Sequence, residues 1–115
     1  MRKVNKDEKW VINKEIEGSS PAPGIVRKVL AYCDSMMCVE HYIDSNTDLA
    51  QHSHPHAQIA YVVEGSFRFT IGDETREVGK GDSLYLPGNV KHGAFCLEKG
   101  LVVDFFTPMR EDFVK

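Results

Sequence analysis

The most constraining feature of this sequence is a series of short apolar runs separated by glycine at near-regular intervals. Seven of the nine glycines fall between residues 65 and 100. The runs between them are rich in Val, Ile, Tyr and Phe, and none has the periodicity of an amphipathic helix. The pattern predicts an all-β domain of about eight short strands, closed into a sandwich or small barrel that limits its exposed edges.

Individual strands are expected where apolar and polar residues alternate between turn residues. The clearest alternation spans residues 67–71, and a Glu64-Gly65 corner joins it to residues 59–63, so we expect a hairpin there. Further strands are expected at residues 26–32, 37–43, 75–78, 83–86, 93–97 and 101–106. Residues 1–24 contain Pro21, Pro23 and Gly24 and are expected to form an N-terminal arm, with residues 25–115 forming the single barrel domain.

Length and charge exclude several classes of partner. The chain has 115 residues and a net charge of -3, with no cluster of Lys and Arg long enough to follow a phosphate backbone, so we expect no nucleic-acid partner. No run approaches the ~18 consecutive apolar residues of a membrane span, and we expect neither membrane insertion nor export. The three cysteines contain no CxxC pair, which favours reduced thiols and a cytoplasmic location.

A histidine cluster between residues 51 and 58 is the least random local feature. On an extended chain alternate side chains share a face, so His52 and His54 are expected to project together as a two-point metal site. Pro55 interrupts the alternation, so the same face cannot be assumed for His56 and Gln58. The competing interpretation is a solvated polar loop with incidental histidines.

A second stretch, residues 81–92, favours the metal interpretation. It reads as a glycine, a strand, a proline turn and then His92, which is placed to enter the sheet again and could close the site.

Together these two stretches carry a family resemblance. Residues 52–65 resemble the first cupin motif and residues 81–92 resemble the second, in order and at a typical short separation. The resemblance implies a cupin β-barrel, the double-stranded β-helix or jelly roll of RmlC-like proteins. It places a divalent transition metal (Ni, Fe, Zn, Mn or Co) on four ligands: His52, His54, Gln58 and His92.

The sequence departs from the cupin pattern at four positions. Asn46 and Asn89 stand where glycine is expected, and asparagine also tolerates left-handed turns. Cys96 stands in place of an asparagine, and we expect it to be a buried, inert thiol. Gln58 replaces the commoner glutamate, so the ligand set is neutral and leaves the full charge of the ion to attract an anionic substrate.

The remaining histidines have simpler interpretations. We expect His56 to line the pocket wall without binding the metal, and His41 to be an ordinary strand histidine.

The C-terminal stretch from Leu101 to Phe113 is apolar on both faces except at Asp104. A carboxylate inside such a strand is costly unless it is paired or functional. Asp104 is therefore a candidate general acid or base, or the partner of Arg110 in a structural ion pair.

This tail, D-x-F-x-P-x-R-E-D-F, and the HSHPHxQ form of the first motif resemble KdgF-type pectin-degradation cupins, although Ala57 stands where that family has glutamate. Those proteins help to open the ring of 4,5-unsaturated uronates released by polysaccharide lyases. The resemblance implies that Asp104, Phe106 and Arg110 line the pocket as catalytic residues and that the partner is a small anionic sugar acid.

Two alternative functions stay open at this level. A metal-dependent dioxygenase-type cupin and a non-catalytic small-molecule-binding cupin are compatible with the same motifs.

The apolar residues 10–12 of the arm have little to pack on in a thin domain, and cupins of this kind are commonly dimers, so we expect a homodimer.

Overall fold

The computed structural model describes residues 1–115 as an antiparallel β-structure with only two short 3-10 turns, η1 (Asn13–Glu15) and η2 (Glu111–Phe113). This confirms the all-β prediction. Neither turn is long enough to be a membrane-crossing helix. The strands are β1 (Ser19–Ala22), β2 (Ile25–Cys33), β3 (Met36–Ile43), β4 (Asp48–His52), β5 (Ala57–Ile71), β6 (Glu74–Gly79), β7 (Ser83–Leu86) and β8 (His92–Thr107).

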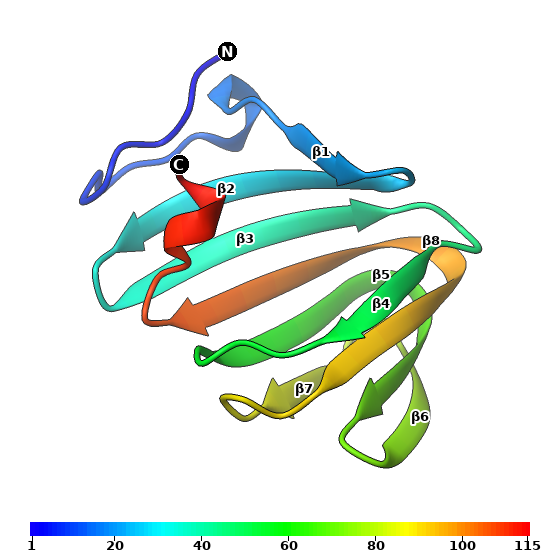
Figure 1. Cartoon of the computed structure of the whole chain (residues 1–115). Coiled ribbons are helices and arrows are strands. Elements are labelled where there is room, and N and C mark those ends of the chain that lie inside the picture. The colour runs from blue at the N-terminus through cyan, green and yellow to red at the C-terminus, as the bar shows by residue number, and fades with distance from the viewer.

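Two long strands, β5 and β8, run side by side and belong to both layers of the barrel (Figure 1). The first half of β8 pairs with β4, and its second half pairs with β3, which continues the sheet to β2 and β1. The first half of β5 pairs with β7, and its second half pairs with β6. The barrel therefore encloses a space between two layers that share their central strands.

The expected hairpin at Glu64-Gly65 is wrong. Residues 59–63 and 67–71 form one bent strand, β5, and residues 93–97 and 101–106 likewise form β8. Gly65 has φ of +88°, and a Cβ there would lie 2.6 Å from the Cα of Gly100 on β8. Two glycines packed at the corner let both strands bend without losing their partner, since no side chain occupies the inside of the bend.

The N-terminal arm contains a strand that was not predicted. β1 pairs with β2 despite Pro21, which is tolerated because β1 is an edge strand. Val4 and Ile16 are buried, whereas Trp10 is 83% exposed.

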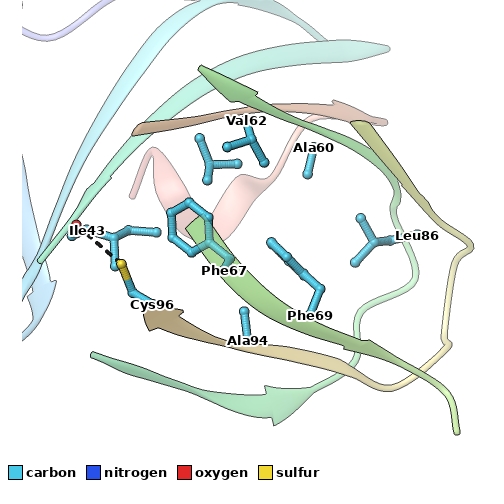
Figure 2. Close-up of a cluster of buried hydrophobic side chains, with 9 residues drawn as sticks. Ile43, Ala60, Val62, Phe67, Phe69, Leu86, Ala94 and Cys96 are labelled. Atoms are coloured by element: carbon cyan, nitrogen blue, oxygen red, sulfur yellow. Dashed lines mark hydrogen bonds between the residues drawn. The ribbon is translucent and has the colours of Figure 1, made fainter. Parts of the chain in front are cut away.

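Nine buried apolar residues fill the space between the layers (Figure 2). Phe67 is fully buried and lies beside Phe69, at 6.0 Å between ring centroids. Cys96 is also fully buried, and its thiol contacts the carbonyl oxygen of Ile43, so it is the buried thiol that was expected. The cluster consists of Ile43, Ala60, Val62, Phe67, Phe69, Leu86, Ala94, Cys96 and Val102.

Asparagine performs the role of glycine at two turns. Asn46 and Asn89 have φ of 64° and 67°, in the left-handed region. Their backbone N–H groups donate to the carbonyl oxygens of Cys96 and His54 respectively, each at 2.7 Å. The two departures from the cupin pattern therefore preserve the turns next to the histidine cluster.

Candidate functional site

Three histidines from separate segments converge at one side of the barrel. His52 ends β4, His54 lies in the loop between β4 and β5, and His92 begins β8, where it faces His52 across the strand pair. Their potential ligand atoms lie within 4.8 Å of one another. His54 and His92 are buried, and His52 is exposed to solvent. As predicted, His52 and His54 project toward the same place and His92 approaches them.

Each of these rings is oriented by a backbone carbonyl. The Nδ1 atoms of His52, His54 and His92 lie 3.0, 3.0 and 3.1 Å from the carbonyl oxygens of Ala50, His56 and Val90. A carbonyl can only accept, so in each neutral ring the hydrogen sits on Nδ1 and Nε2 keeps its lone pair. The lone pairs of three Nε2 atoms are therefore free to coordinate one metal ion. Metal-binding histidines in proteins are commonly oriented in this way, by a hydrogen bond from the other ring nitrogen.

Gln58 adds an oxygen to this set. Its Oε1 lies 3.0 Å from the Nε2 of His54, while its Nε2 donates to Oδ1 of Asp104 at 2.7 Å, which fixes the orientation of the amide. With the His54 hydrogen on Nδ1, two lone pairs face each other. Protonation of His54 would relieve this contact, but burial, assisted by the charge of Arg110, lowers its pKa below the ordinary value of 6.5.

A metal cation resolves the same contact without a proton. It would accept the lone pairs of both atoms, together with those of His52 and His92, whose pKa is also lowered, chiefly by burial. Three imidazoles and an amide oxygen form a neutral donor set suited to a divalent transition metal. The residues present therefore fit such an ion.

Asp104 connects the histidine site to the interior of the barrel. It is 5% exposed on β8, and its second oxygen, Oδ2, lies 2.7 Å from Nδ1 of His41 on β3. The alternative ion pair with Arg110 is wrong, because Arg110 instead makes a two-point contact with Asp112, at 3.0 and 2.8 Å. Asp104 is paired, but its partners are the neutral side chain of Gln58 and a histidine.

Gln58, Asp104 and Arg110 line a cavity of about 370 Å³ between the two layers. Its floor is part of the apolar core, and Pro21 and Ala22 of β1 contribute to its wall. Phe106 is buried, with its ring 5.7 Å from that of His54, and the Arg110 guanidinium lies 5.1 Å from the Phe106 centroid. The polar and aromatic residues of the cavity include His52, Gln58, His92, Asp104, Phe106 and Arg110.

His56 lies beside the site without joining the converging histidines. Its ring is 5.6 Å from that of His54 and 6.5 Å from that of Phe106, and its Nδ1 is buried without a hydrogen-bond partner.

Two residues of the cavity were missed by the sequence analysis. His41 was interpreted as an ordinary strand histidine, and Arg27 was not considered. Arg27 on β2 and His41 on β3 are cross-strand partners, and Nε of Arg27 donates to Nε2 of His41 at 3.0 Å. The alternation of side chains along a strand could have identified His41. It lies two residues from Val39 and two from Ile43, which are both buried, so it shares their inward face.

Comparison with known proteins identifies the family of the chain. The cupin domain model matches residues 39–106, which include every histidine discussed above. Pectin degradation protein KdgF of Dickeya dadantii (strain 3937) is 35% identical over 108 residues, covering 92% of this chain and 98% of that protein.

Two solved structures are similar over nearly the whole chain. KdgF from Halomonas sp. has a TM-score of 0.88 and 36% identity, covering 92% of this chain and 98% of that one. An RmlC-like cupin from Shewanella frigidimarina has a TM-score of 0.91 and 32% identity, covering 96% and 99%. The chain therefore belongs to the cupin domain family and, within it, to the KdgF proteins.

Proposed function

We propose that this protein is a metal-dependent enzyme that opens the ring of 4,5-unsaturated uronates, small anionic sugar acids from the breakdown of pectin or related polysaccharides. The similarity to proteins named for pectin degradation supports the substrate class. The single structural observation that carries the proposal is the direct connection from His54 through Gln58 to Asp104, which joins a metal-binding set to a carboxylate in one cavity.

In this proposal His52, His54, Gln58 and His92 hold the ion. A divalent metal bound there would act as a Lewis acid toward oxygen atoms of the substrate. Iron, nickel, cobalt, zinc and manganese all accept imidazole-rich sites, so we propose a transition metal of this group.

Asp104 is proposed to move the proton. Each of its oxygens accepts one hydrogen bond, from Gln58 and His41, and each keeps a further lone pair. Asp104 takes the proton of the C1 hydroxyl as the bond between C1 and the ring oxygen breaks, and the electron pair stays on that oxygen. Delivery of that proton to C4 then converts the resulting enolate into a ketone, so the reaction is an isomerisation that needs no other reactant.

Phe106 and Arg110 are proposed to position the sugar. The buried Phe106 ring offers an apolar surface for one face of the sugar, and the Arg110 guanidinium offers charged donors for its carboxylate.

We also propose a cytoplasmic homodimer with no nucleic-acid or membrane partner. The dimer is proposed on Trp10 and Ile12 of the arm, two exposed apolar side chains close together in the chain that a second subunit would cover.

The test follows the ultraviolet absorbance of 4,5-unsaturated galacturonate, whose conjugated enol ether is lost when the ring opens. We expect metal-loaded protein to accelerate the decay well beyond the buffer rate, and we expect chelation to abolish the acceleration. Decay at the buffer rate with every metal of the group would contradict the proposal. Oxygen uptake with an aromatic substrate would then indicate a dioxygenase, and recovery of unchanged bound sugar would indicate a binding protein.

A further inference from the structure

The two arginines of the cavity differ in their partners. Arg110, whose side chain is 12% exposed, is neutralised by the two-point contact with Asp112. Arg27 has no carboxylate within ion-pair distance, and its one side-chain hydrogen bond runs from Nε to His41. Its two terminal amino groups have no protein partner. Arg27 is therefore a half-buried charge that the protein leaves without a counter-ion.

The contact with His41 does not supply the missing negative charge. Arg27 can only donate, so Nε2 of His41 accepts, and the imidazole hydrogen lies on Nδ1, where it is donated to Asp104. His41 is thus a neutral spacer. It holds Arg27 in place while keeping the guanidinium apart from the Asp104 carboxylate, which already accepts from Gln58.

An aromatic ring holds both arginines close together. The Cζ atoms of Arg27 and Arg110 lie 3.6 and 4.3 Å from the centroid of Phe113 on η2. Burial, followed by the charge of Arg110, lowers the pKa of Arg27, although the charges of Asp112 and Asp104 act in the opposite direction. Stacking on a ring uses the face of a guanidinium and leaves its N–H edge free for a planar anion.

We infer that Arg27, held by His41 and Phe113, forms with Arg110 a carboxylate-binding subsite in which Arg27 supplies the unneutralised charge. This inference rests on the proposed function, in which the ligand carboxylate belongs to a uronate. A carboxylate beside Arg27 provides the missing counter-ion and matches the forked geometry of the guanidinium. Arg27 thereby selects sugar acids over neutral sugars.

A purely structural role for Arg27 explains less. A half-buried charge without a paired counter-ion is less stable than a paired one, and a neutral side chain could hold His41 without that cost. The unpaired guanidinium is explained when an anion enters the cavity.

The test compares two sugars that differ at one group: galacturonate, which carries a carboxylate, and galactose, which carries a hydroxymethyl group there. Dissociation constants are measured by NMR titration of the Zn²⁺-loaded protein. We expect the wild type to bind galacturonate at least about tenfold more tightly than galactose, because only galacturonate can accept charged hydrogen bonds from the guanidinium.

Three variants are compared with the wild type. Arg27→Gln is expected to weaken galacturonate binding about tenfold and to leave galactose binding unchanged. Arg27→Lys keeps the charge but loses the fork, so its loss should be smaller, about threefold. Arg68→Gln removes an equally charged side chain that is exposed on β5 and does not line the cavity, and it should change neither constant.

Several results would overturn the inference: no preference for galacturonate in the wild type, an equal loss for both sugars in Arg27→Gln, or no loss at all. If Arg27→Gln does not fold, Arg27→Lys must still lose affinity for galacturonate alone, and an unchanged constant overturns the inference. The ring-opening assay is a separate readout. Failure of that assay with Arg27-dependent galacturonate binding would reject the proposed reaction and leave the subsite standing.

Discussion

The apolar core and the cavity are made by the same two strands, yet they differ in almost every property. Inward-facing residues of β5 and β8 near the bend are apolar and fully buried, as Phe67 and Cys96 are. Toward the cavity the same faces carry Gln58 and Asp104. Every polar side chain of the cavity discussed above is held by a hydrogen bond or an ion pair. The residues that stabilise the fold and the residues proposed for the chemistry thus lie at different positions along β5 and β8.

The largest effect is expected in the core. Phe67→Ala should lower the free energy of unfolding by about 3–5 kcal/mol, because it removes a fully buried ring and leaves a void. Urea unfolding measures this. Phe105→Ala, on the outer face of β8 where the ring is 46% exposed, is the matched control and should cost less than about 1 kcal/mol. Similar losses in both variants would contradict the role of the cluster.

The next effect is expected in the cavity and on activity. Asp104→Asn should slow ring opening by about a hundredfold or more, because the amide cannot accept the substrate proton. Its Oδ1 can still accept from Gln58, so bound metal, measured by elemental analysis, should be retained. Asp73→Asn, in the exposed turn between β5 and β6, should have the wild-type rate. A wild-type rate in Asp104→Asn would reject its catalytic role.

A smaller effect concerns pH. The pKa values of His54 and His92 lie below 6.5 in the folded protein, mainly through burial, so below pH 6.5 the unfolded chain takes up protons that the folded chain does not. The free energy of unfolding of the metal-free protein should therefore decrease as the pH falls through 6.5. Urea unfolding above and below this pH measures the slope.

Two variants assign that slope to a region. His92→Asn should reduce it, whereas Phe67→Ala should lower stability equally at both pH values, because no titrating group is changed in the core. A slope unaffected by His92→Asn would show that the pH dependence has another source.

The smallest effect on the chain itself is expected in the arm, outside both regions. Trp10→Ser should change the stability of the subunit by no more than about 0.5 kcal/mol, because the side chain is 83% exposed. Light scattering should nevertheless show weaker dimerisation. A dimer that is unaffected would place the subunit contact elsewhere.

Much of the fold was predictable because alternation is a local signal. The predicted ranges 26–32, 37–43, 75–78 and 83–86 correspond to β2, β3, β6 and β7. The continuity of β5 and β8 was not predictable, since a glycine corner looks like a turn until the partner strand is known. β1 was missed because proline disfavours strands, and only its edge position makes Pro21 acceptable.

The sequence by itself determined the all-β class and the histidines and Gln58 that gather at one place, because their types and spacing carry that information. Only the tertiary structure decided the partners of Asp104 and Arg110 and brought Arg27 and His41 into the cavity. The physical reason is cross-strand register. Side chains far apart in the chain become neighbours only when strands pair, and no local pattern records which ones will meet.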